Sequence, residues 1–288
     1  MTWEIAWSII LDALKDSALV LVFVLFIHVL LSFFEHNLSN FLVKLKKAGP
    51  LFGSLFGLVP QCGTSVMGAE LYIGKYITIG TLTAIFLSCS DEALIAILTS
   101  GKPDKMLMVL PLIGLKFAIG FAVGLIMDLI MRKQEVIQTD EVVEETECHA
   151  HHTHNTGIHK HLVHPLIHSL EIFAYVLTIN LLLGFIIALV GEENFSNFIR
   201  MNKYLSPLFA SIIGLIPNCA SSLLLAELFI EGNLSFGALL GGLLVNAGLG
   251  MMVLLKNRKV VKSMLLILLI CLFVAITAGY ITCLISGF

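Results

Sequence analysis

Two adjacent acidic residues in an apolar stretch are the side chains of this sequence best suited to bind a cation. Asp91 and Glu92 follow Cys89 within the apolar segment 77–99. An ionised carboxylate at membrane depth is costly unless it is paired, protonated, hydrated or bound to a cation. Carboxylate oxygens beside a thiol suit a first-row divalent transition metal better than a purely hard ion. We therefore predict that Asp91, Glu92 and Cys89 provide the main ligands of a metal cation.

A duplicated motif adds further polar groups. The segments PLFGSLFGLVPQCGTSVMGAELY (50–72) and PLFASIIGLIPNCASSLLLAELF (207–229) align without a gap at an offset of 157 residues. Each contains Gly-x-x-Pro-(Gln/Asn)-Cys, and the proline should break or kink a helix. In lipid a broken helix is tolerated only beside protein or a cavity, and matched breaks in two halves indicate a transporter binding site. The residues that we add to the predicted substrate or metal site are Gln61, Cys62, Asn218 and Cys219.

Other polar side chains in apolar segments are assigned secondary polar or gating roles. At the offset of 157, Asn246 replaces Cys89 and no acid replaces Asp91 or Glu92, so the halves should contribute unequally. Two interpretations of Lys116 stay open. In one, it forms a buried pair that merely neutralises Asp91 or Glu92. In the other, it binds the carboxylate when substrate is absent and releases it when a cation or proton arrives. The remaining members are Ser65, Ser222, Glu70, Glu227 and His28. For the two glutamates the alternative is snorkelling to the headgroups, and for the histidine a hydrogen bond to a neighbouring helix.

The segment 134–164 is the one extended polar tract, acidic at first and then rich in histidine. Neutral imidazole and thiolate bind metals, and a solvated tract of this composition has too few apolar residues to fold alone. No spacing matches a closed structural zinc site. We predict a disordered linker that binds metal weakly at several positions: Cys148, His149, His151, His152, His154, His159 and His161.

The composition indicates an all-α integral membrane protein. Hydrophobic residues make up 58% of the 288 residues, charged residues 13%, and the mean hydropathy is +0.96. Apolar runs near the ~20 residues that a helix needs to cross a bilayer recur along the chain, at 17–34, 51–73, 77–99, 106–131, 166–190, 207–230, 234–255 and 263–286. No basic face for nucleic acid and no disulfide framework is expected. The predicted units are a first transmembrane repeat (1–133), the linker (134–164) and a second repeat (165–288).

The residues alone leave two topologies open: parallel repeats of four spans, or inverted repeats in which each broken segment is a two-legged hairpin. The paired motifs GLVPQCGTSV and GLIPNCASS, the run SCSDEA and the histidine-rich middle resemble the ten-transmembrane heavy-metal exporter family. Members of this family are also labelled manganese transporters or arsenic-permease-like proteins. Ten spans imply five in each half, which favours an inverted five-plus-five repeat with a broken or re-entrant helix in each copy. The resemblance also implies a prokaryotic plasma (inner) membrane.

We expect a secondary transporter that moves a divalent transition-metal cation across that membrane, outward. No nucleotide-binding motif is present, so an ion gradient, of protons or another ion, would supply the energy. The metal is substrate, and no cofactor is expected. A metalloid or organic-anion permease that uses half-helix N-termini and Lys116 is the alternative. A membrane-embedded enzyme with Cys62 or Cys219 as nucleophile is less favoured, because few residues of the apolar segments could act as the base that such a cysteine needs. The metal's identity, the linker's side and a homo-oligomeric state stay open.

Overall fold

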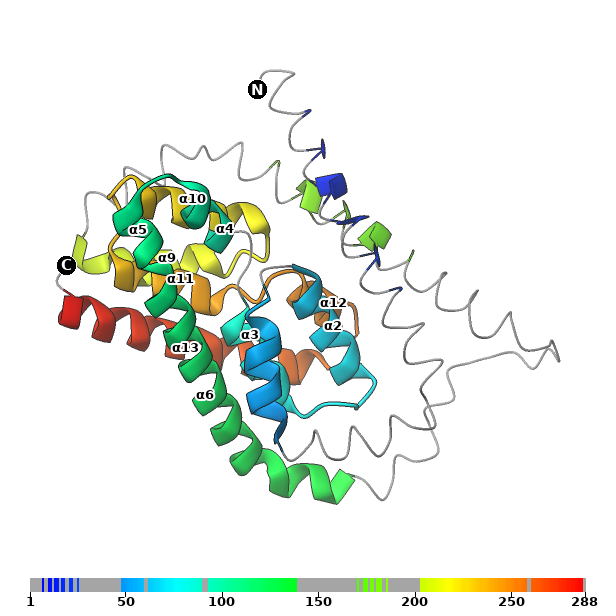
Figure 1. Ribbon diagram of the computed structural model, residues 1–288. Helices are drawn as coiled ribbons and strands as arrows, with labels where there is room; N and C mark the ends of the chain where they lie inside the picture. The colour runs from blue at the N-terminus through cyan, green and yellow to red at the C-terminus, as the bar shows by residue number, and fades with distance from the viewer. Residues whose placement is uncertain are drawn as a thin grey trace.

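The computed structural model describes residues 48–59, 62–89, 93–138, 203–257 and 260–286, with scattered single residues in 7–25 and 170–185. All regular structure within these ranges is helical (Figure 1). Most of the predicted spans 166–190 and 17–34 and the histidine-rich part of the linker lie outside the described residues. The all-α architecture agrees with the expectation from composition.

The first half contains a helix over 48–57 followed by α2 (Cys62–Ile73), α3 (Ile79–Ser88), α4 (Ala93–Thr99), α5 (Pro103–Leu107) and α6 (Val109–Gln138). The second half contains η2 (Lys203–Leu205), α9 (Ser206–Gly214), α10 (Cys219–Ile230), α11 (Phe236–Val245), α12 (Gly250–Lys256) and α13 (Val261–Ser286). Helices α10, α11 and α12 begin and end 157 residues after α2, α3 and α4. The duplication seen in the sequence is therefore repeated helix by helix.

Local signals explain several of the helix boundaries. Thr78 precedes α3 and Ser235 precedes α11, and each side-chain hydroxyl accepts a hydrogen bond from a backbone N–H of the first turn. Such N-caps satisfy a donor that a helix end leaves without a partner. Pro103 lies at the first turn of α5, where its missing N–H costs nothing. Helix α6 continues to Gln138, five residues into the predicted linker, because 132–138 contains no glycine or proline.

Helix packing follows the duplication. Helix α3 packs on α6, and α11 packs correspondingly on α13. Both contacts are close: a Cβ on Gly80 would lie 2.2 Å from the carbonyl oxygen of Gly124, and one on Gly237 would lie 2.5 Å from that of Gly279. Between the halves, α2 packs against α12, and α4 packs against α10, the equivalent of α2. Two helices of each half therefore pack against the other half.

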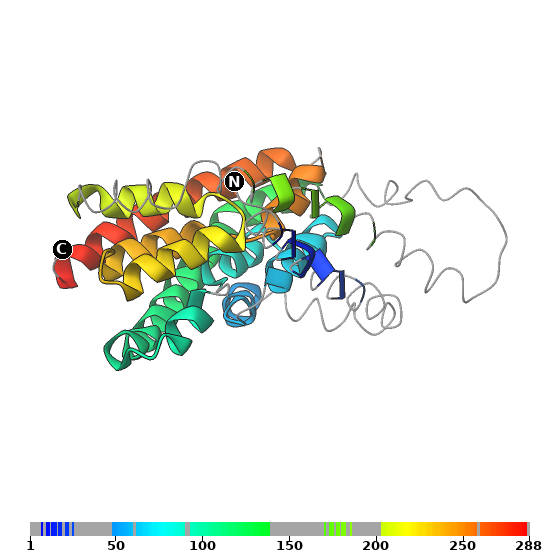
Figure 2. The same cartoon turned by 90° about the horizontal axis from the view of Figure 1, so that it is seen from above.

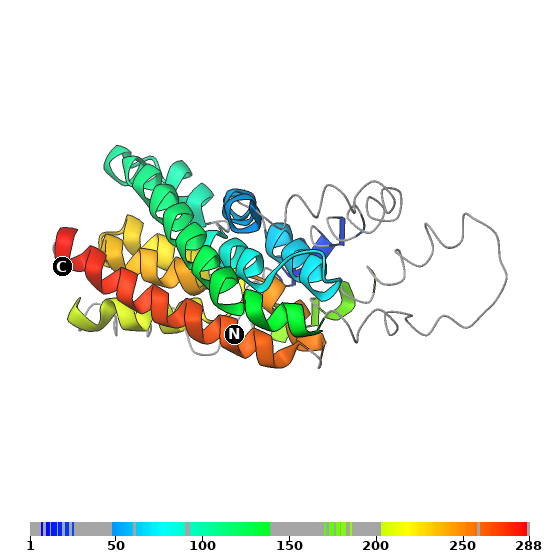
Figure 3. The same cartoon turned by 90° about the horizontal axis from the view of Figure 1, so that it is seen from below.

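The two long helices run in opposite directions. Helix α6 runs from the end of the bundle that carries α5 and the C-terminus toward the opposite end, and α13 runs back (Figures 1 and 3). The α10–α11 turn lies at the α5 end, whereas the α2–α3 turn lies at the other end (Figures 1 and 2). Equivalent turns of the two repeats therefore lie at opposite ends of the bundle.

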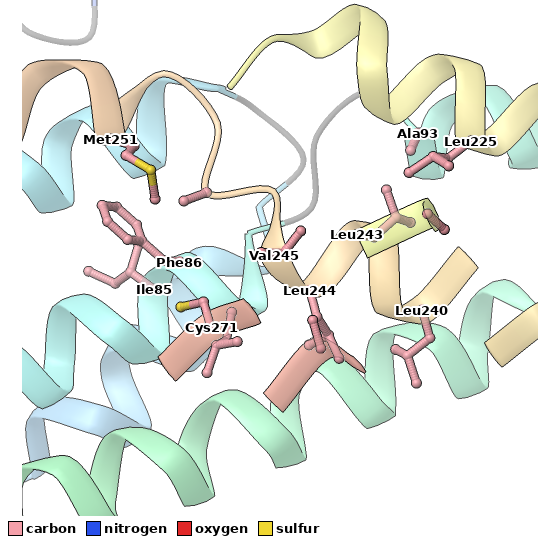
Figure 4. Packing of buried hydrophobic residues seen from close by; sticks show 14 of the residues in the cluster. Ile85, Phe86, Ala93, Leu225, Leu240, Leu243, Leu244, Val245, Met251 and Cys271 are labelled. Carbon is pink, nitrogen blue, oxygen red and sulfur yellow. The ribbon is translucent and has the colours of Figure 1, made fainter. Parts of the chain in front are cut away.

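Four segments of the described chain are long and apolar enough to cross a membrane: Ile79–Thr99, Pro103–Met131, Phe236–Lys256 and Val261–Ser286. The segment Phe236–Lys256 is 94% buried, whereas Val261–Ser286 is 28% buried. The core between them contains Phe86 of α3, Leu244 of α11 and Cys271 of α13 (Figure 4). Helices α6 and α13 therefore form the outer face, and the interrupted segments form the interior.

Candidate functional site

Helix interruptions gather polar groups in the apolar interior. Helix α9 ends at Gly214 and α10 begins at Cys219, so the residues between them, including Asn218, are not helical. A second interruption separates α11 from α12 at residues 246–249. In the first half α3 ends at Ser88 and α4 begins at Ala93, at the corresponding positions. Interruptions therefore recur at corresponding positions of the two halves.

The sequence does not reveal the interruptions after Ser88 and at 246–249, since it predicts 77–99 and 234–255 as single spans. Neither contains a proline. The signal that could have revealed the second is Asn246-Ala247-Gly248-Leu249-Gly250, in which Gly248 adopts a φ of 58°. Glycine accepts this left-handed conformation without the strain that a Cβ would cause. The turn therefore depends on Gly248.

Lys116 of α6 is a charged side chain that reaches the ends of α3 and α11, and it is 1% exposed. Its ammonium donates hydrogen bonds to the carbonyl oxygen of Cys89, directly after α3, and to that of Leu243, in the last turn of α11, at 2.7 Å. Carbonyls in the last turn of a helix lack intrahelical partners and carry partial negative charge. The lysine therefore joins the C-terminal ends of one interrupted helix from each half.

Asn246 connects the two interruptions of the second half. Its side-chain oxygen accepts from the Gly248 backbone N–H at 3.0 Å, and its side-chain nitrogen lies 3.4 Å from the Ser221 hydroxyl. That hydroxyl in turn donates to the carbonyl oxygen of Asn218 at 2.7 Å. The network holds the α11–α12 turn beside the start of α10.

The two motif serines have different partners. The Ser65 hydroxyl of α2 accepts from the backbone N–H of Gly250, the first residue of α12, at 3.2 Å. A Cβ on Gly250 would lie 2.2 Å from the carbonyl oxygen of Ser65, so the two helices touch through their backbones. The Ser222 hydroxyl instead donates to the carbonyl oxygen of Cys219 within α10 at 2.8 Å. Ser65 therefore links the halves, whereas this bond of Ser222 stays within one turn.

The structure buries most of the predicted site residues that it describes. These are Cys89, Asn218, Cys219, Ser65, Ser222, Asn246 and Lys116. Cys62 is the first residue of α2, Glu70 is half-buried on α2, and Glu227 is exposed on α10. The predicted residues that lie outside the described part of the chain are Gln61, Asp91, Glu92, His28 and the linker residues Cys148, His149, His151, His152, His154, His159 and His161. Among the described side chains, no group of three or more His, Cys, Asp or Glu residues could hold a metal.

One acid was overlooked in the sequence. Asp128 of α6 accepts from the Thr78 hydroxyl at 2.9 Å and from the Gly80 backbone N–H at 2.9 Å. Both partners belong to the start of α3, where a carboxylate is favoured by the helix dipole. The signal was an acid inside the apolar run 106–131. Asp128 fixes α6 on α3 at the end of the helix farthest from the interruption.

A family comparison gives this arrangement its context. The family described as "Putative, 10TM heavy-metal exporter" matches residues 2–191 and again residues 169–287. The chain belongs to this family. The resemblance inferred from the paired motifs is thereby confirmed. Searches of curated proteins and of solved structures each returned no match.

Membership of the heavy-metal exporter family agrees with the apolar helices of the structure. The chain is a membrane protein of a transporter family, and metal ions are the substrates that such an exporter would handle. A family of exporters favours transport over catalysis, as the sequence also did. In a helical membrane protein, non-helical backbone at membrane depth is tolerated where protein or a water-filled cavity surrounds it.

Proposed function

We propose that this member of the heavy-metal exporter family is a secondary transporter that moves a divalent transition-metal cation out of the cell across the plasma membrane, driven by an ion gradient. The observation that carries the proposal is the position of Cys89. It is buried, and it lies ten residues from either end of the 21-residue span Ile79–Thr99. A residue midway along a membrane-spanning segment lies near the middle of the bilayer. Asp91 and Glu92 follow it in the chain.

Helices of both halves pack together next to this segment. Helix α4, whose first residue follows Glu92, packs against α10, and Ala93 lies beside Leu225 in the core (Figure 4). Helix α10 begins at the buried Cys219, which follows the buried Asn218. Carboxylate, thiol and amide groups together suit a borderline transition metal. We assign the main ligands to Asp91, Glu92 and Cys89, and completing ligands to Gln61, Cys62, Asn218 and Cys219.

We further propose that the halves form an inverted five-plus-five repeat. The opposite directions of α6 and α13 support this topology (Figure 3). So does the placement of the α2–α3 and α10–α11 turns at opposite ends of the bundle (Figure 1). In such folds half-helix ends near the midplane bind the substrate and the coupling ion. Protonation of Asp91 or Glu92 would couple metal release to a proton gradient.

Metal flux in proteoliposomes tests the proposal. Purified protein should transport at least one of Mn²⁺, Fe²⁺, Co²⁺, Zn²⁺ and Cd²⁺, and the double variant Asp91→Asn/Glu92→Gln should lose that flux by roughly tenfold or more. Loss of even an outer partner of a metal ligand costs about 10- to 100-fold, so loss of direct ligands should cost at least as much. The matched control is Asp104→Asn/Glu231→Gln, which makes the same chemical changes at exposed residues. Equal flux in the two double variants would refute the assignment of the acids.

A second candidate function, a metalloid or organic-anion permease, is favoured by one observation. The N-terminus of α12 meets the first turn of α2 through Ser65 and Gly250, so two helix N-termini adjoin. Helix N-termini favour anions. The same proteoliposomes loaded with arsenate or a small carboxylate distinguish the candidates. In this alternative the Asp91→Asn/Glu92→Gln variant keeps or improves anion flux while no metal flux is seen in the unmodified protein.

Deleting the linker distinguishes metal transport from metal that is only bound to the linker. Deleting residues 139–164 removes the histidine-rich tract but leaves α6, which ends at Gln138. If the pathway lies between the interrupted helices, the deletion variant still transports metal. If metal only accumulates on the linker, the apparent uptake disappears with it.

A further inference from the structure

The junction of α3 and α11 has the features of a cation site. The carbonyl of Cys89 follows the end of α3, and that of Leu243 would pair, in a continuing helix, with the N–H of residue 247, beyond the end of α11. Carbonyls at half-helix C-terminal ends coordinate monovalent cations in other membrane proteins. Here the ammonium of Lys116 donates to both oxygens. A side chain of the protein thus occupies the position of a cation.

The described groups at this junction have opposite charges. A helix C-terminus carries the equivalent of about −0.5 elementary charge, so two that adjoin carry about −1. The Lys116 ammonium places a positive charge against both ends. At the offset of 157 Lys116 corresponds to Phe273, which is 70% exposed, so the second half supplies no equivalent cation. A single lysine therefore serves one helix end from each half.

We propose that Lys116 is a tethered counter-cation, a positioning residue that fills a carbonyl site for a monovalent cation between the two halves. The ammonium holds the ends of α3 and α11 together and makes the junction independent of dissolved ions. Removing it should expose a site for small cations. This inference does not rest on metal transport, since it concerns the stability of the protein without substrate.

The test is thermal unfolding of the purified protein in detergent at constant ionic strength. The unmodified protein should have the same Tm in choline, Na⁺, K⁺ or propylammonium chloride. Lys116→Ala should lower Tm in choline by roughly 5 °C or more, because two buried helix ends lose their counter-charge. Propylammonium or K⁺ should restore part of this loss in a saturable way. A side chain that only fills space would give no such dependence on the cation.

The matched control is Lys102→Ala. Its ammonium also donates to the carbonyl of the last residue of a helix, Ile230 of α10, at 2.8 Å, but this bond is exposed to solvent. Because water can replace the ammonium there, Tm should change little and should not depend on the cation. A cation-dependent recovery in Lys102→Ala equal to that in Lys116→Ala would contradict a specific site.

Lys116→Arg and Lys116→Met separate charge from packing. Arginine keeps the positive charge and the donors, so Lys116→Arg should be more stable in choline than Lys116→Met. The proposal is wrong if Lys116→Met is as stable as the unmodified protein, or if Lys116→Arg fails to fold just as Lys116→Met does. In either case the position does not require a positive charge. A folded Lys116→Ala whose Tm is indifferent to K⁺ and propylammonium would overturn it equally.

Discussion

Ser65 and Ser222 occupy equivalent positions but should differ in their contribution to stability. The Ser65 hydroxyl accepts from the N-terminus of α12, in the other half, whereas the Ser222 hydroxyl bonds a carbonyl in its own turn. Ser65→Ala leaves a buried donor on Gly250, which costs about 1–3 kcal/mol. Loss of the local bond of Ser222 should cost less than about 1 kcal/mol. Thermal unfolding of the two alanine variants tests this; equal losses would show that Ser65 does not link the halves.

Asp128 should stabilise the protein through the start of α3. Asp128→Ala removes the acceptor of the Thr78 hydroxyl and of the Gly80 backbone N–H. We expect a loss of about 1–3 kcal/mol, measured as a fall in Tm of several degrees. Asp104→Ala, at an exposed acid in the first turn of α5, is the control and should change Tm by less. If the two variants behave alike, the bonds of Asp128 contribute nothing measurable.

The sequence could identify Lys116 as a buried charge but not its partners. The predicted partners were Asp91 and Glu92, which lie outside the described residues, so that pairing stays a prediction. The carbonyls of Cys89 and Leu243 carry no signature in the sequence, because every residue has a carbonyl. Which carbonyls lack a partner within their own helix depends on where α3 and α11 end.

At the scale of helices, close packing of α11 on α13 requires glycine. A Cβ on Gly237 would lie 2.5 Å from the oxygen of Gly279 and 2.6 Å from the nitrogen of Cys283, both backbone atoms. Gly237→Ala should therefore push the helices apart at a cost of about 1–3 kcal/mol. Gly114→Ala on α6 has nothing within 4 Å and should stabilise the helix slightly. A Gly237→Ala variant that unfolds no earlier than Gly114→Ala would contradict this packing.

Helix boundaries were predictable where the sequence contains a local stop signal. Helix α9 ends at Gly214 and α10 begins at Cys219, the first and last residues of the Gly-x-x-Pro-Asn-Cys motif. The end of α3 at Ser88 was not predictable, because the residues that follow contain neither glycine nor proline. The apolar residues on either side outweigh Ser90, Asp91 and Glu92 in the mean hydropathy of the span, so composition alone indicates one helix.

For the whole molecule, the constant offset predicted two homologous halves, and the helices follow that offset. The exchange of partners, α2 with α12 and α4 with α10, was not predictable. A repeated sequence shows that two units are alike but not how they are docked. The relative orientation of the units is a property of tertiary packing, and it determines which residues of the two halves meet.

Basic residues indicate the cytoplasmic end of the bundle. One end carries the α2–α3 turn, the C-terminal part of α6 and the α12–α13 turn, and the other carries α5 (Figures 1 and 3). The described basic residues of the first end are Lys75, Arg132, Lys133, Lys256 and Lys262, and those of the other end are Lys102, Lys105 and Lys203 of η2. Short cytoplasmic loops carry the excess of Lys and Arg. We therefore expect the α2–α3 turn inside the cell and the α10–α11 turn outside.

Cysteine labelling in whole cells tests the central claim, the inversion of the two halves, most directly. Lys75→Cys and Glu231→Cys place an exposed thiol in the two equivalent turns. Each is made in a Cys148→Ser background, which also sets the background signal from the native cysteines. With a membrane-impermeant maleimide, Glu231→Cys should label in intact cells and Lys75→Cys only after permeabilisation. Labelling of both from the same side would mean parallel repeats and would contradict the account.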